Sequence, residues 1–217
     1  QRQMCIRDRS YVLFHLTQAE LKKILLPVGD FNKAEIRDIA EKYGLVTAQK
    51  RESMEICFIP SNDHAAFIAK NYPEMKSGEG NFVDPEGNIL GRHKGIEKYT
   101  VGQGRGLEIS LGKKVYVLEI RKDKNEVVLA EDGAVYFDGL IGKDFHFLQK
   151  PVKSHYGVKI RHQRDEIPAE IISYDEKSFR LELRFLEKAR AVTPGQGLAI
   201  YDGEELIGGG WIESSIH

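Results

Sequence analysis

The chain has 217 residues, of which 41% are hydrophobic and 30% charged, so it can bury a core in one or two domains. Its formal net charge of −1 argues against a strong nonspecific polyanion binder, although local basic clusters can still bind phosphates, so net charge does not decide the partner. No run of about eighteen apolar residues occurs, and the first residues lack the apolar stretch of a secretory signal. Composition therefore predicts a cytoplasmic protein with no membrane segment.

Residues 1–9 differ in texture from the rest of the chain. They show no hydrophobic periodicity and no helix cap, whereas an ordered pattern begins at Ser10. We interpret them as a non-native start and exclude Cys5 from any mechanism. The chain has two cysteines, Cys5 and Cys57, which are too few for a disulfide scaffold. A redox or nucleophilic role is therefore favoured over a structural one.

Two capping boxes predict two helices near the beginning of the chain. Thr17 stands three residues before Glu20, and Asn32 stands three residues before Glu35. The first helix is expected to continue until Pro27 stops it. Apolar stripes support both helices: Leu21, Ile24 and Leu25 in the first, and Ile36, Ile39, Ala40 and Tyr43 in the second.

Gly44 occupies the position of a left-handed cap after the second helix. Residues 45–48 are then expected to form a short strand, and Asp63 to cap a third helix that ends before Pro73. Amphipathic helices with so little sheet cannot bury their apolar stripes. The chain is therefore expected to be truncated at its N-terminus.

From Gly78 onward, short β-branched and aromatic runs separated by turn residues predict antiparallel β structure. Residues 115–120 and 126–130 flank a predicted hairpin turn at 122–125. The alternation of apolar and charged residues over 179–185 predicts a strand with one buried face. A boundary between two β modules is placed near 134–143, where four residues interrupt the hydrophobic pattern: Gly133, Asp138, Gly139 and Gly142.

Cys57 lies between Ile56 and Phe58, a setting typical of an inert buried thiol. Two features favour a nucleophile instead. The polar run 50–55 places charge beside the thiol, and the start of the third helix lies within several residues, where backbone N–H groups stabilise a thiolate. The residues alone leave both interpretations open.

Two polar clusters offer donors for a nucleic acid. Three glycines in the loop 102–106 allow close backbone approach, and Gln103 and Arg105 present donors, although a tight solvated loop has the same composition. Farther on, alternation would place Lys159 and Arg161 on one strand face, with His162 or Tyr156 available to stack on a base. The alternative for this basic patch, which also includes Gln163 and Arg164, is a solvated strand face.

Five blocks, in order, carry a resemblance that spans essentially everything from Ser10 to His217. They are Ser10-Tyr11 with the helix after it, Pro27-Val28-Gly29, Glu52-Ser53 with Ile56-Cys57-Phe58-Ile59, Val101-Gly102-Gln103 with Arg105-Gly106-Leu107, and Ala191-Val192-Thr193-Pro194-Gly195-Gln196. Together they resemble the tRNA-specific 2-thiouridylase family. The resemblance departs at Gly104, where the family more often has a basic residue.

The resemblance implies an α+β multidomain fold. Residues 10–63 would be the tail of a Rossmann-like α/β domain of the adenine nucleotide alpha hydrolase type. Residues 64–134 would form a small central β-rich domain, and residues 135–217 a C-terminal antiparallel β-barrel. The ATP-binding part of the family's first domain is absent from this chain, so the chain alone is expected to be inactive.

The function implied is ATP-dependent 2-thiolation of the wobble uridine of tRNA, by a sulfurtransferase that uses a cysteine persulfide. Cys57 matches the persulfide-bearing cysteine, and a second cysteine upstream would resolve the intermediate and leave a disulfide. A persulfide sulfur-carrier protein is the implied partner of a monomeric, metal-free enzyme. The tRNA contacts implied are Arg161, His162, Gln196, Gln103, Arg105, Arg7, Asp8 and Arg9.

A rival hypothesis from another class is a non-catalytic RNA-binding module. In this hypothesis the chain carries a translation-factor-like β-barrel, and Cys57 is inert. The reactivity of the Cys57 thiol separates the two, because an active thiol has a pKa below the free value of about 8.5.

Overall fold

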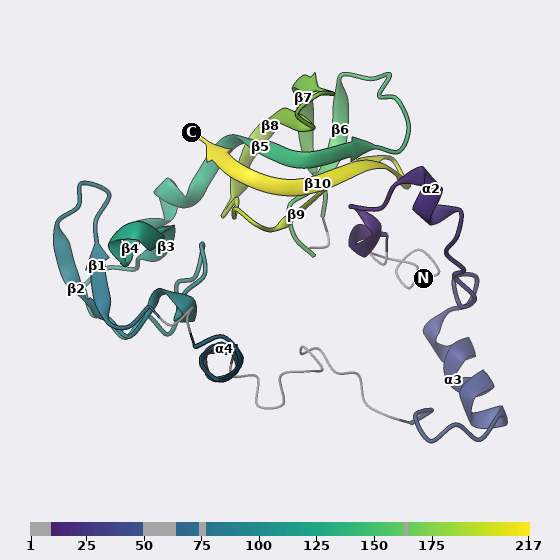
Figure 1. Cartoon of the computed structure of the whole chain (residues 1–217), viewed down its shortest axis with the longest axis horizontal. Helices are drawn as coiled ribbons and strands as arrows, with labels where there is room; N and C mark the ends of the chain where they lie inside the picture. Colours follow the sequence, from purple (N-terminus) through teal and green to yellow (C-terminus); the bar gives the residue numbers. More distant parts are fainter. Residues whose placement is uncertain (1–9, 50–63, 74–76, 163–164) are drawn as a thin grey trace.

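A computed structural model describes residues 10–49, 64–73, 77–162 and 165–217 (Figure 1). Short helices come first, a four-stranded sheet follows, and a closed six-stranded barrel completes the chain. Within the described ranges, no helix is both long and apolar enough to cross a bilayer.

The two predicted capping boxes are confirmed. α2 (Gln18–Leu21) follows η1 (Tyr11–Leu13), and the Thr17 N–H donates to the Glu20 carboxylate at 2.8 Å while the Glu20 N–H donates to the Thr17 hydroxyl. α3 (Lys33–Lys42) has the same reciprocal pair between Asn32 and Glu35. Each box satisfies helix N–H groups that have no partner in the first turn. Gly44 adopts the expected left-handed conformation, with φ of 63°.

Other expectations for this part were wrong. α2 is a single turn, and Leu25, predicted to lie in its apolar stripe, is 88% exposed. Residues 45–48 form a turn in which the Ala48 N–H donates to the Leu45 carbonyl, because no described strand lies beside them to pair. The third helix is confirmed as α4 (His64–Asn71), whereas its predicted cap, Asp63, lies outside the described residues.

The central sheet has the strand order β2-β1-β4-β3. Its strands are β1 (Gly80–Val83), β2 (Ile89–His93), β3 (Tyr116–Arg121) and β4 (Glu126–Ala130). The predicted β3–β4 hairpin is confirmed, and its turn closes at Asn125, which has φ of 50°. β1 and β4 pair in parallel, so the prediction of purely antiparallel structure was wrong for this pair. The long connection 94–115 carries the chain across the sheet and allows this alignment.

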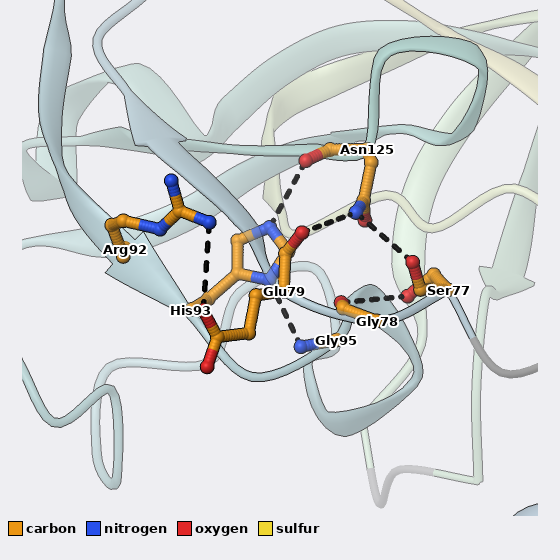
Figure 2. A network of polar contacts seen from close by, with 7 residues as sticks. All are labelled: Ser77, Gly78, Glu79, Arg92, His93, Gly95 and Asn125. Carbon is orange, nitrogen blue, oxygen red and sulfur yellow. Dashed lines mark hydrogen bonds and ion pairs between the residues drawn. The ribbon is translucent and has the colours of Figure 1, made fainter.

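A buried polar network ties the hairpin turn to the sheet (Figure 2). His93 is 2% exposed, and its Nδ1 accepts the Gly95 N–H at 3.1 Å. Its Nε2 must then carry the proton, and it donates a hydrogen bond to the Asn125 carbonyl at 3.2 Å. The Asn125 amide donates to the carbonyls of Ser77 and Glu79 at 3.2 and 2.9 Å. Burial lowers the pKa of His93, while the hydrogen bond to the Asn125 carbonyl acts in the opposite sense.

The barrel closes in the antiparallel order β10-β5-β8-β7-β6-β9. Its strands are β5 (Tyr136–Phe147), β6 (His155–Lys159), β7 (Ile167–Asp175), β8 (Arg180–Arg190), β9 (Gly197–Asp202) and β10 (Glu205–Ile216). η5 (Asp132–Val135) connects the central sheet to β5. The predicted alternation is confirmed in β8, where Leu181, Leu183 and Phe185 are buried. Phe179 was wrongly included, since it precedes the strand with φ of 52° and is 42% exposed.

The sequence suggested that Gly139 and Gly142 interrupt the hydrophobic pattern. In the structure they do not. Both lie inside β5, which crosses most of the expected boundary region. A Cβ added to Gly139 would collide with the Leu183 carbonyl of β8, and one added to Gly142 would lie 2.8 Å from the Leu198 side chain. These glycines allow neighbouring strands to pack closely in a small barrel.

Candidate nucleic-acid interface

One end of the barrel brings two arginines together. Arg161 follows β6, and its Nη2 donates to the carbonyl of Arg190, the last residue of β8, at 2.8 Å. Burial, followed by the nearby Arg190 guanidinium, lowers the pKa of Arg161. A half-buried guanidinium held beside a second one is a position where a phosphate would relieve like-charge repulsion.

Tyr11 lies between His162 and Gln196, two other residues predicted to contact tRNA. Its hydroxyl donates to the Gly197 carbonyl at 2.9 Å, next to Gln196, and its ring meets the edge of His162 at a centroid distance of 6.2 Å. Burial, with a smaller contribution from Tyr201, raises the pKa of Tyr11 to about 12, while Arg161 acts in the opposite sense. Tyr11 is therefore a neutral hydrogen-bond donor at physiological pH.

Gln196 ends the turn between β8 and β9. Its N–H donates to the Thr193 carbonyl at 3.2 Å, and its own carbonyl accepts the Ile212 N–H at 2.8 Å. Gly195 has φ of 84°, a conformation that glycine adopts without strain. The Gln196 side chain is exposed. The structure thus gathers three predicted residues around Tyr11, and we call them the barrel rim: Arg161, His162 and Gln196.

The glycine-rich loop 101–106 lies against the same end of the barrel. A Cβ added to Gly102 would be 2.5 Å from the Ala191 side chain, and one added to Gly104 would collide with the Tyr116 ring. The Arg190 guanidinium lies over that ring, 4.7 Å from its centre. Any side chain at position 104 would therefore require the Tyr116 ring to move.

The two candidate donors of this loop have different environments. The Gln103 Oε1 accepts the Thr100 N–H at 3.0 Å, and its Nε2 donates to the Arg105 carbonyl at 2.9 Å, so this side chain closes the loop. The backbone N–H groups of Gly102 and Gln103 donate to Val117 and Thr100, which leaves them unsuited to cradling a phosphate. Arg105 is exposed.

Two expectations about the basic patch were wrong. Lys159 is 5% exposed, with its Nζ 3.8 Å from a Glu166 oxygen and over the Tyr201 ring, so it does not track a backbone with Arg161. The pattern breaks because β6 ends at Lys159, and strand alternation does not extend to Arg161. Tyr156 cannot stack on a base, since it is buried and its hydroxyl accepts the N–H groups of Val152 and Lys153.

Several predicted residues lie outside the part that the structure describes. They are Cys57, Arg7, Asp8, Arg9, Gln163 and Arg164, together with Cys5, which was excluded from the mechanism. Among the described residues, no group of three His, Cys, Asp or Glu side chains could hold a metal ion.

Sequence reasoning missed two residues that shape this site, Tyr11 and Arg190. Tyr11 stood in one of the blocks that carry the resemblance, but nothing local linked it to Gly197, 186 positions away. Arg190 ended a predicted strand region without any motif of its own.

Three family models match consecutive parts of the chain. They are a tRNA methyl transferase HUP domain over residues 2–61, a tRNA methyl transferase PRC-barrel domain over 65–131 and an aminomethyltransferase beta-barrel domain over 137–212. With the closed barrel and the mixed sheet, they confirm the predicted fold class of an α/β segment, a central β-rich domain and a C-terminal antiparallel barrel.

Curated relatives cover nearly the whole chain. The tRNA-specific 2-thiouridylase MnmA of Carboxydothermus hydrogenoformans is 42% identical over 97% of the chain and 58% of its own length. MnmA 1 of Clostridium tetani is 45% identical and MnmA of Clostridium kluyveri 44%, each over 96% of the chain and 58% of its own length. The chain thus spans less than two thirds of these relatives. On the order, extent and identity of these matches, the chain belongs to the tRNA-specific 2-thiouridylase family.

Proposed function

We propose that this chain is the RNA-gripping and sulfur-bearing part of an enzyme that replaces the C2 oxygen of a wobble uridine in tRNA with sulfur. The observation that carries the proposal is the barrel rim, where Arg161, His162 and Gln196 lie around Tyr11. A cation, an exposed imidazole and an exposed amide at one edge suit a phosphate, a base face and a base edge. Relatives named as 2-thiouridylases favour this over a non-catalytic RNA-binding module.

The loop beside the rim extends the proposed RNA surface. Arg105 would contact the RNA directly, whereas Gln103 holds the loop that presents it. Arg7, Asp8 and Arg9 are proposed as further contacts from the family resemblance. We also propose the division of the chain at residues 10–63, 64–134 and 135–217, a monomeric state and a cytoplasmic location.

Sulfur transfer is proposed to run through Cys57. The terminal sulfur of a Cys57 persulfide would form the bond to C2, while the C2–O bond breaks and the oxygen leaves with AMP. A second cysteine, other than Cys5, would then attack the Cys57 sulfur, release the thiocarbonyl and leave a disulfide for a thiol reductant. A persulfide sulfur-carrier protein would reload Cys57.

ATP would supply the activation that makes the C2 oxygen a leaving group. The glycine-rich loop does not fit a triphosphate, because the N–H groups of Gly102 and Gln103 are already engaged. The curated relatives are longer than this chain, and we propose that their additional residues bind ATP.

The rim is tested by the salt dependence of RNA binding. Replacing Arg161 with Ala should weaken binding of an unmodified tRNA with a wobble uridine and reduce the slope of log K against log salt by about 1, since one phosphate contact is lost. Binding is measured by fluorescence titration at several salt concentrations. Arg180→Ala is the matched control, because Arg180 lies at the opposite end of β8 from Arg190. An unchanged slope in Arg161→Ala would remove Arg161 from the interface.

The sulfur-bearing role is tested by comparing the two cysteines of the chain. After treatment with polysulfide, the Cys5→Ser variant should gain one sulfur atom by mass and release thiocyanate with cyanide, because Cys57 remains. The Cys57→Ser variant should do neither. In the Cys5→Ser variant, the pH dependence of thiol labelling should give a pKa for Cys57 below about 8.5. Equal persulfide formation on both variants would support the inert-thiol alternative.

A further inference from the structure

Residues 10–14, which we call the strap, pack closely against the barrel. Phe14 is 7% exposed and packs with Ala199 and Tyr201 of β9. Its ring also meets Trp211 of β10 edge-on, with centroids 4.9 Å apart. The Ser10 hydroxyl and the Tyr201 hydroxyl are 3.2 Å apart, which fixes the other end of the strap. The strap belongs to the part of the chain matched by the HUP-domain model.

Two barrel glycines make this seat possible. A Cβ added to Gly209 would collide with the Phe14 carbonyl, and one added to Gly197 would lie 2.6 Å from the Phe14 ring and 3.0 Å from the Tyr11 hydroxyl. Backbone carbonyls and buried rings cannot move aside cheaply in a packed interior. The surfaces of the strap and the barrel are therefore complementary in shape at this contact.

Tyr11 is the strap residue that reaches the rim. The Tyr11 hydroxyl donates to the Gly197 carbonyl, and the Ile212 N–H donates to the Gln196 carbonyl. The turn is therefore held from two sides. The Tyr11 ring lies against His162 at an interplanar angle of 73°. One side chain from the first domain thus touches two separate loops of the barrel.

We infer that Tyr11 is a positioning residue that fixes His162 and the turn bearing Gln196 in the geometry that binds RNA, and that the strap couples the first domain to the barrel rim. This inference rests on the proposed function. Without the Tyr11 hydroxyl, the turn would keep its two backbone hydrogen bonds to Ile212 but lose its hydrogen bond to the strap, and RNA binding would first have to select the correct geometry. The role is indirect, because Tyr11 acts through its neighbours.

The test replaces Tyr11 with Phe, which keeps the ring and removes the hydrogen bond. The chain offers a matched control in Tyr174→Phe, because the Tyr174 hydroxyl donates to the Phe145 carbonyl at the same distance of 2.9 Å within the barrel. Tyr11→Phe should weaken binding of an unmodified tRNA with a wobble uridine by about threefold to tenfold, in line with one lost hydrogen bond. Tyr174→Phe should leave the affinity unchanged.

A double-variant comparison separates positioning from general loss of structure. If Tyr11 acts through the turn, adding Tyr11→Phe to Gln196→Ala should change affinity by less than about twofold, because the turn's contact is already gone. Without RNA, the Gln196 amide should exchange with solvent faster in Tyr11→Phe than in Tyr174→Phe. Tyr11→Phe should also keep the salt slope of the unaltered chain, since no phosphate contact is lost.

The outcomes are distinct. If the unaltered chain binds tRNA and the two Tyr→Phe variants bind it equally, the positioning role is overturned and the proposed function stands. Fully additive losses in the double variant would likewise overturn it. If the unaltered chain does not bind tRNA, the proposed RNA grip fails and the inference fails with it.

Discussion

At the scale of single residues, His93 makes the stability of the central sheet depend on pH. Its folded-state pKa is lowered by burial, so the unfolded chain binds a proton first as pH falls. We expect the free energy of unfolding to be constant above about pH 6.5 and to fall below it, by at most about 1.4 kcal/mol per pH unit for this one group. Urea titrations between about pH 5 and 8, followed through NMR amide signals of β1 and β4, measure it.

The variant His93→Gln should lower stability at neutral pH and flatten this dependence, because glutamine gains no charge. His155→Gln is the control, since His155 is exposed on the barrel. If His93→Gln and the unaltered chain lose stability equally between pH 6.5 and 5, His93 is not the group responsible.

The candidate site also shows what single residues reveal in a sequence. Arg161, His162 and Gln196 were predicted as contacts because they match positions that the resembling family uses to bind tRNA, and of the three only Gln196 lies in one of the quoted blocks. Strand alternation, by contrast, placed Lys159 on the surface, yet the barrel buries it beside Glu166 and Tyr201. Side-chain environment depends on which strands close the barrel, and residue types alone do not encode that.

At the scale of elements, signals confined to a few residues were reliable. Both capping boxes, the left-handed Gly44 and the β3–β4 hairpin involve hydrogen bonds between residues close in sequence. Expectations that needed a distant partner failed more often. Residues 45–48 form no strand without a neighbour, and the parallel pairing of β1 with β4 depends on how a long connection crosses the sheet.

Glycines were misread at this scale for the same reason. Gly139 and Gly142 resembled loop residues, whereas each sits in β5 where another strand approaches closely. A glycine in a turn and a glycine under a packed strand look alike in a sequence. The register between β5 and β8 explains Gly139, and the packing of Leu198 from β9 explains Gly142.

At the scale of the whole molecule, Arg190 joins the central sheet to the barrel. It ends β8, lies over the Tyr116 ring of β3 and pairs with Asp132 of the connecting helix η5 at 3.3 Å. The N–H of the next residue, Ala191, donates to the Val135 carbonyl at 2.8 Å. The joint places the glycine-rich loop beside the barrel rim, so both parts of the proposed RNA surface depend on it.

Replacing Arg190 with Ala should loosen this joint while leaving the barrel folded. The half-exposed ion pair with Asp132 contributes little to stability. Most of the loss in free energy at the joint, about 1 to 2 kcal/mol, should therefore come from the contact with Tyr116. The Ala191 amide should then exchange with solvent roughly tenfold faster, whereas the fluorescence of Trp211, the single tryptophan, should keep its unfolding midpoint. Arg180→Ala removes an exposed ion pair with Glu213 of β10 and should not affect Ala191. Equal exchange rates in the two variants would mean that Arg190 does not hold the joint, and that the connecting helix alone sets the placement of the loop.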